Sequence, residues 1–418
     1  MKYLVLHGDG MGDYAVKELG GRTPLQAART PAMNFLAERG TLGMVRTIPP
    51  GFPPGSDVGS LSLMGYDPRK YYTGRSPLEA AALGVFLSPG ETSFRTNLVF
   101  LSGQKPAPVL SGERFDDLIM GDFSAGHIPS EEGKDIILTV NQKLGEPRIR
   151  FFPGTSYRNL LVVQGSFPGL ATVPPHDITG KRIGDYLPRG NGSELLVPMM
   201  EKSLIILAEH QVNVRRRSQG QTPANCIWIW GQGTAPELPG FREKYGLSGG
   251  VISAVGLVRG IARLIGLKTV LVPGATGYLD TNYRGKLEAA LGILTEDDFA
   301  YIHVEAPDEA AHTGKLELKI QAIEDFDREI VKKALDALEG WQGIPRLPGG
   351  EPVKILLAID HRTPLVLKTH SEEPVPFAML PGGKSSGSGL PYDESAAERS
   401  GIFIEDGSTL MDFFLRQT

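Results

Sequence analysis

The sequence predicts an α/β fold in which a mostly parallel sheet lies between helices and a smaller α+β domain is inserted. Two observations support this prediction. Compact apolar runs, typical of strands covered on both faces, alternate with helical patterns near both ends of the chain. After about residue 88 the pattern changes to alternating polar and apolar residues between turn residues, as in antiparallel sheets. The apolar runs are residues 2–6, 225–230, 268–274, 299–306 and 353–360.

The N-terminal elements follow from local signals. The first apolar run ends in His7-Gly8-Asp9-Gly10, which predicts a buried strand followed by a turn. A helical pattern covers 30–39 and stops at a glycine. Residues 47–59 are rich in proline and glycine, so a shaped loop is expected there. The alanine-rich stretch 76–85 predicts a short helix.

The change in the pattern of apolar and polar residues divides the chain into two expected domains. Residues 89–191 are predicted to form an inserted lid, and residues 1–88 together with 192–418 a catalytic core. Within the core, helical patterns cover 193–210, 251–266 and 316–338. The last of these carries one apolar stripe at helical spacing, formed by Leu316, Ile320, Ile323, Phe326, Ile330 and Leu335.

Composition narrows the classes of protein. The 418 residues are 41% hydrophobic and 22% charged with a net charge of −5, which argues against a nucleic-acid-binding surface. The single cysteine, Cys226, excludes intrachain disulfides and thiolate metal sites. No apolar run approaches a membrane span, and the N-terminus does not match a secretory signal. We therefore expect a cytoplasmic protein without a membrane or nucleic-acid partner; a homo-oligomer is left open.

Carboxylate and imidazole side chains follow several of the predicted strands. Asp9 ends the first strand in a glycine-rich turn, where it is either a metal ligand or the acceptor of a simple turn. Asp308 and His312 are spaced to share one face of a helix, although a capping aspartate with a surface histidine gives the same pattern. Asp360 and His361 close an apolar strand, where buried polar groups need partners. His370 follows nine residues later.

Ser56 is the candidate nucleophile. It lies between prolines and glycines in the loop 47–59, so its backbone is constrained. Taken alone, the pattern favours an exposed loop serine. Beside a bound cation, however, a hydroxyl loses its proton more readily and can attack a phosphoryl group.

Together these motifs resemble the alkaline phosphatase superfamily and, within it, the archaeal-type cofactor-independent phosphoglycerate mutases. The resemblance spans nearly the whole chain. It implies an alkaline-phosphatase-like core with an inserted lid, and no requirement for 2,3-bisphosphoglycerate. The motifs that carry it, in order, are residues 9–13, 21–40, 53–59, 63–68, 71–84, 174–181, 303–328 and 360–377.

The resemblance also implies two divalent cations and a transient phosphoserine at Ser56. One cation would be held by Asp9, Ser56, Asp360 and His361, and the other by Asp308, His312 and His370. Ligands rich in oxygen favour Mn²⁺ or Mg²⁺, and the histidines leave Zn²⁺ open. The implied reaction moves a phosphate between the 3- and 2-hydroxyls of glycerate, so the partner is a small phosphorylated metabolite.

Positive charge is needed around the phosphate and carboxylate of such a substrate. Arg75, Arg158 and Lys286 lie in motifs of the family and are expected to clamp these groups. For Arg158 a solvated surface charge is an equal alternative. His176 and Asp177, in the expected lid, either contact substrate or cap the next segment.

Four further side chains lie within apolar runs or at a strand end. His303, inside an apolar run, is expected to be a satisfied core histidine. His7 either orients a neighbouring metal ligand or simply ends its strand. Trp228 and Trp230 alternate within an apolar run and are expected to belong to the core.

The chain also departs from the family pattern. Ser60 stands where many archaeal-type relatives have histidine, and Arg362 where a small residue is common. These departures suggest a bacterial side branch, for which a homoserine-kinase-like phosphotransferase is the alternative activity. The chain has no P-loop motif, so nucleotide binding would need another device. A non-catalytic binding protein is the third hypothesis, which the intact ligand set opposes.

Overall fold

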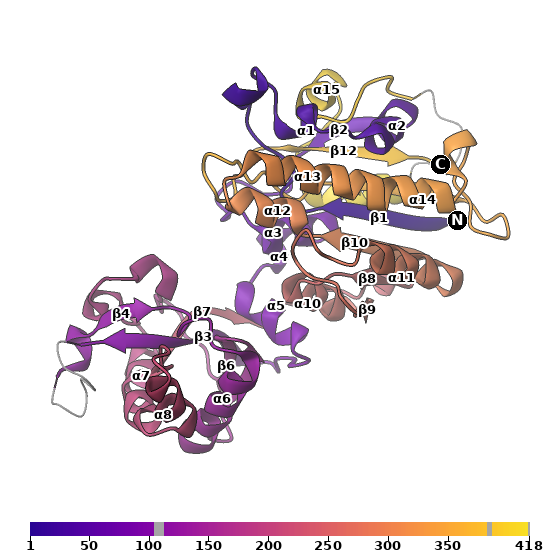
Figure 1. Cartoon of the computed structure of the whole chain (residues 1–418). Helices are drawn as coiled ribbons and strands as arrows, with labels where there is room; N and C mark the ends of the chain where they lie inside the picture. The colour runs from indigo at the N-terminus through magenta and orange to yellow at the C-terminus, as the bar shows by residue number, and fades with distance from the viewer. Residues whose placement is uncertain (104–112, 383–386, 417–418) are drawn as a thin grey trace. The chain divides into compact units, whose positions relative to one another are not determined.

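The computed structural model describes residues 1–103, 113–382 and 387–416 (Figure 1). The chain forms two compact units, Met1–Tyr72 with Glu237–Thr418 and Thr73–Pro236. The second unit contains the expected insertion, 89–191, but begins earlier and ends later. The reason is packing: α5 (Arg75–Ala82) and β7 (Cys226–Thr234), which flank the expected insertion, contact β3 (Glu91–Ser102) inside it.

The first unit is built on an eight-stranded, mostly parallel sheet with the order β13-β2-β12-β11-β1-β10-β8-β9. At its centre β1 pairs in parallel with both β10 and β11, so three strand ends with carboxylates or histidines are neighbours. Only β12 runs antiparallel to its neighbours. The strands are β1 (Lys2–Gly8), β2 (Thr41–Val45), β8 (Gly249–Ile252), β9 (Lys268–Val270), β10 (Phe299–Val304), β11 (Val353–Ala358), β12 (Val375–Leu380) and β13 (Phe403–Ile404).

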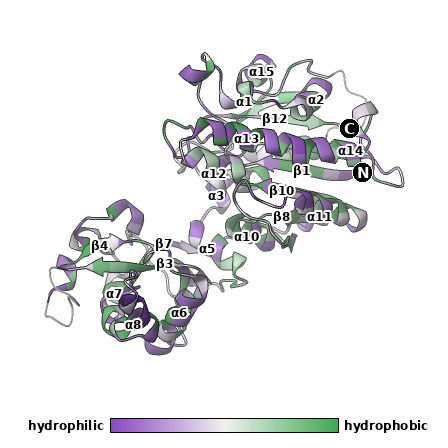
Figure 2. Cartoon of the chain, in the orientation of Figure 1, coloured by the Kyte–Doolittle hydropathy of each residue, from purple (hydrophilic) through white to green (hydrophobic). Residues whose placement is uncertain are grey.

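Helices cover this sheet with apolar faces inward. Figure 2 shows purple and green residues on the same helices, as expected of amphipathic elements, and Figure 1 shows α13 and α14 lying over β1. The helices are α1 (Pro24–Ala27), α2 (Pro31–Arg39), α3 (Ser56–Leu63), α4 (Pro68–Tyr71), α9 (Phe241–Tyr245), α10 (Gly256–Leu264), α11 (Tyr283–Glu296), α12 (Ala306–His312), α13 (Leu316–Phe326), α14 (Lys332–Ala337), α15 (Glu394–Arg399) and α16 (Leu410–Arg416).

Two of the predicted helices of this unit are confirmed with changes. The helix expected over 30–39 is α2, which starts at Pro31. The Asp327 carboxylate accepts hydrogen bonds from the first free amides of this helix. The long helical pattern over 316–338 forms α13 and α14 joined by a π-helical turn, Asp327–Val331. Its stripe is buried at Ile323, Phe326, Ile330 and Leu335.

The second unit is an antiparallel sheet with helices. Its strands are ordered β4-β3-β6-β5, and β7 pairs with the other side of β3. Helices α6 and α7 pack against this sheet on a core that includes Trp228 and Cys226. The elements are β3 (Glu91–Ser102), β4 (Ile119–Asp122), β5 (Ile149–Thr155), β6 (Arg158–Gln164), β7 (Cys226–Thr234), α5 (Arg75–Ala82), α6 (Ser130–Leu144), α7 (Ser193–Ala208) and α8 (Gln211–Ser218).

The α/β class with a mostly parallel sheet and a smaller second domain is confirmed, but two local predictions were wrong. The run 225–230 was expected to be a parallel strand of the core; it is part of β7, antiparallel to β3 in the second unit. A fully apolar run identifies a buried strand without identifying its partners. The pattern over 251–266, expected to be wholly helical, begins as strand β8 and becomes helix only at α10.

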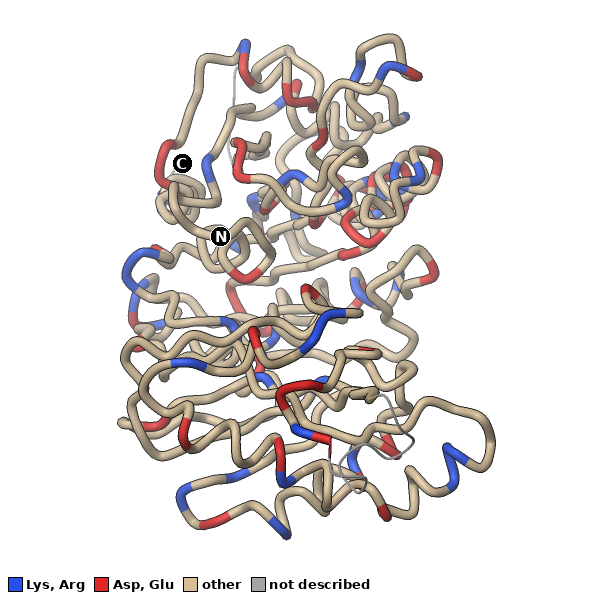
Figure 3. Tube along the Cα trace, turned by 90° about the vertical axis from the view of Figure 1, so that its left-hand side faces the viewer, with Lys and Arg blue, Asp and Glu red and all other residues tan. Residues whose placement is uncertain are grey.

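Charge and hydropathy agree with the composition. Figure 3 shows acidic and basic residues interspersed along the trace. Among the described residues, no helix combines the length and the apolar character that a membrane crossing needs.

Candidate active site

The candidate ligands gather at the carboxyl ends of three neighbouring parallel strands. Asp9 follows β1 directly, Asp360 comes two residues after β11, and Asp308 and His312 lie on α12, which follows β10. Polar side chains at this edge of a parallel sheet have room and partners, which is why α/β sites form there. Ser56 is the first residue of α3.

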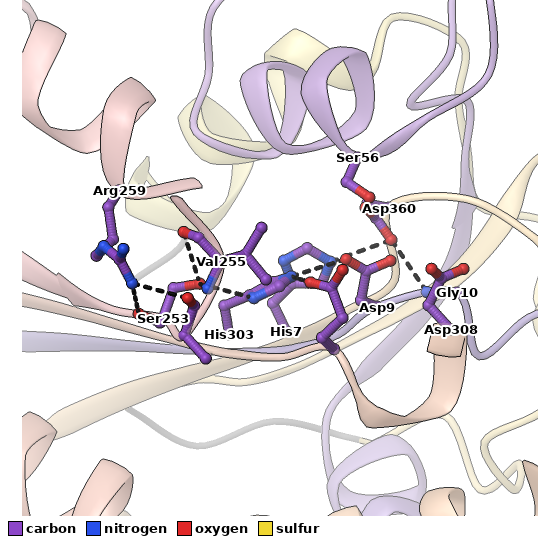
Figure 4. Close-up of polar contacts among 12 residues, drawn as sticks. His7, Asp9, Gly10, Ser56, Ser253, Val255, Arg259, His303, Asp308 and Asp360 are labelled. Carbon is purple, nitrogen blue, oxygen red and sulfur yellow. Dashed lines mark hydrogen bonds and ion pairs between the residues drawn. The ribbon is translucent and has the colours of Figure 1, made fainter. Parts of the chain in front are cut away.

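Asp9, Asp360 and His361, together with the Ser56 hydroxyl, form what we call the inner group. The His361 Nε2 lies 3.4 Å from Oδ1 of Asp9, 3.4 Å from Oδ2 of Asp360 and 3.3 Å from the Ser56 Oγ. Both carboxylates and the imidazole are fully buried. Among the residues that the structure describes, those two carboxylate oxygens accept no hydrogen bond. Figure 4 shows both carboxylates beside the Ser56 side chain.

The pKa values of the two carboxylates of the inner group shift in opposite directions. Burial alone would raise the pKa of Asp360, but the nearby imidazoles of His361 and His7 lower it. Burial raises the pKa of Asp9 well above its usual value, and the negative charges of Asp360, Glu305 and Asp308 raise it further. Buried carboxylates that face one another without a cation are costly, so their arrangement fits a bound divalent cation.

Asp308, His312 and His370 form the outer group. The His312 Nε2 lies 3.1 Å from Oδ2 of Asp308 and 3.1 Å from the His370 Nε2, and His370 is 3.5 Å from the other oxygen of Asp308. Contact with Asp308 raises the pKa of His312 to about 9, against the opposing effect of burial. The two groups are adjacent, because the rings of His361 and His370 are 4.2 Å apart.

Close backbone approach is required where the two groups meet. Gly10 has a φ of +62°, and a β-carbon there would lie 2.5 Å from Oδ1 of Asp308. Its amide donates to Oδ1 of Asp360 over 3.2 Å. The glycine-rich turn that follows β1 therefore brings the Asp9 strand close to both neighbouring loops.

Sequence reasoning missed the side chains that support these loops. The Thr363 hydroxyl contacts Asp308 and lies 3.2 Å from Nδ1 of His361. The fully buried Lys319 donates to Asp13 and to the carbonyl oxygens of Gly12 and Thr363, at 2.8 to 2.9 Å. One ammonium thus joins the loop after β1 to the loop after β11. The only sequence feature that could have pointed to Lys319 was its position within one of the family motifs.

Lys286, expected as a substrate clamp, lies on α11 with its side chain fully buried. Its Nζ donates to the carbonyl oxygen of His303 over 3.2 Å. Burial lowers the pKa of Lys286 to about 8, while Glu305 opposes this shift.

The remaining predicted substrate residues belong to the second unit. Arg75 pairs with Glu79 over 3.0 Å, and the Arg158 guanidinium lies 5.0 Å from the Tyr157 ring centroid. His176 stacks edge-on against Trp230 at 5.5 Å, and its Nε2 lies 3.7 Å from a carboxylate oxygen of Asp177.

Arg95 is a further cation of this unit that the sequence did not single out. Its guanidinium lies 4.0 Å from the Trp230 ring centroid and pairs with Glu79 over 2.9 Å. Burial lowers the pKa of His176, and the charges of Arg95, Arg75 and Arg158 lower it further, so these cations surround one imidazole. An alternating strand position, in β3, was the only sequence signal for Arg95.

The expectations for the two tryptophans are confirmed, since Trp228 and Trp230 are buried. The expectation for His303 is confirmed only in part. It is a fully buried and satisfied histidine, but one of its partners is Asp9 of the inner group, at 2.8 Å.

An α/β sheet that gathers carboxylates, imidazoles and a serine hydroxyl at its carboxyl edge is typical of enzymes that use divalent cations. The family model of 2,3-bisphosphoglycerate-independent phosphoglycerate mutase matches residues 37–213. A probable enzyme of that name from Geobacter sulfurreducens is 48% identical over 99% of this chain and 100% of its own length. One from Methanosarcina acetivorans is 46% identical over the full length of both chains.

Solved structures agree. A protein from Pyrococcus horikoshii, 29% identical, superposes with a TM-score of 0.79 over 99% of this chain and 96% of its own. The cofactor-independent phosphoglycerate mutase from Thermoplasma acidophilum, 26% identical, gives a TM-score of 0.66 over 100% and 99%. The chain belongs to the family of 2,3-bisphosphoglycerate-independent phosphoglycerate mutases, which are isomerases. These relatives do not favour the alternative of a homoserine-kinase-like phosphotransferase.

Proposed function

We propose that this protein interconverts 3-phosphoglycerate and 2-phosphoglycerate through a phosphoserine at Ser56, without 2,3-bisphosphoglycerate. One observation carries the proposal: the Ser56 hydroxyl lies 3.3 Å from His361 within a buried cluster in which one oxygen of Asp9 and one of Asp360 accept no hydrogen bond from the described residues. Full-length similarity to relatives that are named mutases supports it.

The residues present fit two divalent cations. Asp9, Asp360, His361 and Ser56 would hold one, and Asp308, His312 and His370 the other. When bound, such cations supply positive charge that lowers the pKa of the serine hydroxyl and offsets the charge on the phosphoryl oxygens. Oxygen ligands of the inner group favour Mn²⁺ or Mg²⁺, while the imidazoles of the outer group keep Zn²⁺ as an alternative.

The reaction is a phosphoryl shuttle on Ser56. The serine oxygen loses its proton and bonds to phosphorus, while the bond from phosphorus to the 3-oxygen breaks and that oxygen gains a proton. The glycerate then turns in place, and its 2-hydroxyl loses its proton as its oxygen bonds to phosphorus. The bond from phosphorus to the serine oxygen breaks, and that oxygen regains a proton. The position of Ser56 at the first turn of α3 keeps its hydroxyl in a fixed orientation.

We assign substrate recognition to the cations of the second unit, which would act as the lid. Arg75 and Arg158, and with them Arg95, suit a carboxylate or phosphate because guanidinium binds both groups in bidentate fashion. His176 and Asp177 are the neighbouring polar groups of this surface. Lys286 would add positive charge to the core, since an ammonium with a pKa of about 8 is mostly charged at pH 7.

The setting of the reaction follows from the same proposal. The partner is a small phosphorylated metabolite of glycolysis or gluconeogenesis, handled in the cytoplasm. A homo-oligomer is left open as a prediction, and light scattering on the purified protein would measure the oligomeric state.

An enolase-coupled assay on the purified protein tests the activity. We expect turnover of 3-phosphoglycerate that disappears with EDTA, returns with Mn²⁺ and does not respond to added 2,3-bisphosphoglycerate. Ser56→Ala should abolish turnover, since the variant lacks the hydroxyl that is proposed to carry the phosphoryl group. Ser60→Ala, one turn further along α3 at a buried hydroxyl, is the matched control and should remain active. Activity that survives in Ser56→Ala would reject the phosphoserine route.

A further inference from the structure

Two buried histidines next to the inner group have no role in the function proposed above. His7 and His303 lie side by side on β1 and β10, where they are paired in register, and both side chains are fully buried. Each ring lies between a hydroxyl group on one side and a carboxylate of the inner group on the other. Figure 4 shows both rings beside Asp9 and Asp360.

The surroundings of Ser253 determine which nitrogen of His303 carries the proton. The Ser253 hydroxyl oxygen accepts from the Val255 amide over 2.9 Å and lies 3.0 Å from Nδ1 of His303. Its own proton therefore goes to Nδ1, since the other acceptor, the Val255 carbonyl oxygen, is 3.4 Å away. Arg259 holds this turn by donating to the carbonyl oxygens of Ser253 and Ala254 at 3.0 and 2.8 Å.

A neutral His303 that accepts at Nδ1 carries its hydrogen on Nε2. That Nε2 lies 2.8 Å from Oδ2 of Asp9, so the ring donates to the carboxylate. The other carboxylate oxygen, Oδ1, is the one that faces His361 and accepts no hydrogen bond among the described residues. His303 thus occupies one oxygen of Asp9 and leaves the second available.

His7 has a related position on the neighbouring strand, but without a hydrogen bond to a carboxylate. Its Nδ1 lies 2.8 Å from the Tyr301 hydroxyl, and its Nε2 lies 3.1 Å from Oδ1 of Asp360. The free oxygen of Asp360 is again the one that faces His361. The His7 Nε2 makes no hydrogen bond among the described residues, however, and Oδ1 of Asp360 accepts instead from the amides of Gly10 and His361 over 3.2 and 3.0 Å.

We propose that His303, held by Ser253, is a positioning residue that orients Asp9 for a cation of the inner group. Such outer partners fix the direction of a ligand and commonly change metal affinity or activity 10- to 100-fold when removed. The inference rests on the proposed function insofar as that function needs a cation there.

A third cation bound by the two histidines is the competing interpretation. His7, Asp9 and His303 bring ligand atoms within 4.8 Å of one another. Metal ligands of these types stand about 2.0–2.2 Å from the ion and point at it. His303 Nε2 makes a hydrogen bond of 2.8 Å to Asp9, which it would have to give up in order to bind an ion through that nitrogen.

Metal titration of the full-length protein tests the inference. We expect isothermal titration with Mn²⁺ to find two sites in the wild type and, in His303→Phe, a loss of about 10- to 100-fold in the affinity of one of them. His303→Gln, whose amide can still donate to Asp9, should recover most of that affinity. The same assay on Ser253→Ala should give a smaller loss, which keeps the test available should His303→Phe not fold.

The outcomes separate this inference from the proposed function. Wild-type affinity at both sites in both His303→Phe and Ser253→Ala would overturn it, and so would failure of His303→Gln to bind better than His303→Phe. A third Mn²⁺ per chain in the wild type, lost in His303→Phe, would replace it with the competing interpretation. A protein that binds two Mn²⁺ with the expected variant effects but has no mutase activity would refute only the proposed function.

Discussion

The inner and outer groups use the same types of side chain in different surroundings. In the inner group, the side chains of Asp9, Asp360 and His361 have no exposed surface. In the outer group, the side chains of His312 and His370 are 33% and 21% exposed. The inner carboxylates also contact buried imidazoles from two strands, whereas His312 bonds to the Lys368 carbonyl oxygen in a loop.

This difference in burial indicates that the inner and outer groups bind their cations under different conditions. The inner group lies beside the Ser56 hydroxyl, and its surroundings exclude water, so electrostatic interactions there are strong. The outer group is open to solvent, so a cation there can exchange more easily. We therefore expect EDTA to remove the outer cation first.

The largest effect should come from the inner group. Asp360→Asn keeps the size of the side chain but removes a charge from the buried ligand set. We expect activity in the enolase-coupled assay to fall by more than about a thousandfold, equivalent to roughly 4 kcal/mol, and not to recover at high Mn²⁺. Circular dichroism on the same sample checks folding. A folded Asp360→Asn protein with near-normal activity would remove the distinction between the groups.

Substitutions in the outer group should reduce activity less than substitutions in the inner group. His312→Gln is expected to weaken one Mn²⁺ site by about 10- to 100-fold, with activity that recovers at high Mn²⁺ because the site is accessible. The wild type should also release about one more proton on binding than the variant. The His312 pKa of about 9 means that this imidazole is protonated at pH 7 and must lose its proton to become a ligand. Calorimetry in buffers of different ionisation enthalpy measures that proton, and equal release from the two proteins would contradict the assignment.

The smallest effect on metal binding is expected outside both groups, in the helices over the sheet. Asp327 is buried where it accepts from the first amides of α2, and burial raises its pKa from 3.8 to about 6. Between these values the folded state binds more protons than the unfolded state, so stability should fall as pH rises through this window. We expect Asp327→Asn to reduce that fall by about 2 to 3 kcal/mol, measured by urea unfolding at pH 4 and pH 7. Metal affinity should not change, and a change would show that this helix cap is coupled to the site.

The sequence could predict the α/β class because strand runs and helical stripes are local patterns. The runs at 2–6, 299–306 and 353–360 became β1, β10 and β11, and their adjacency follows from topology. The run 225–230 was assigned to the wrong sheet, because burial of Trp228 is compatible with either partner. The domain boundary differs from the expected one for the same reason. The sequence identifies α5 and β7 as a helix and a strand, but it does not reveal that both pack against β3.

The candidate site shows the same division. Asp9, Ser56, Asp308, His312, Asp360, His361 and His370 could be named from motifs, and the fold brings them together. Arg95, Thr363 and Lys319 could not be singled out, because a charged or hydroxyl residue in a strand, loop or helix has no distinctive spacing. Their roles arise from contacts between segments that are distant in the chain, such as Lys319 with Gly12 and Thr363.

The sequence by itself determined the class of fold, the family and the chemical types of the ligands, because these depend on local periodicity and on motifs of adjacent residues. Only the tertiary structure decided which oxygen of Asp9 and of Asp360 is free. At Asp9 that choice depends on His303 and on the Ser253 hydroxyl behind it, and at Asp360 on the amides of Gly10 and His361. Different segments of the chain bring these groups within hydrogen-bonding range. Hydrogen bonds act over about 3 Å and are directional, so their pattern exists only once the strands are in register.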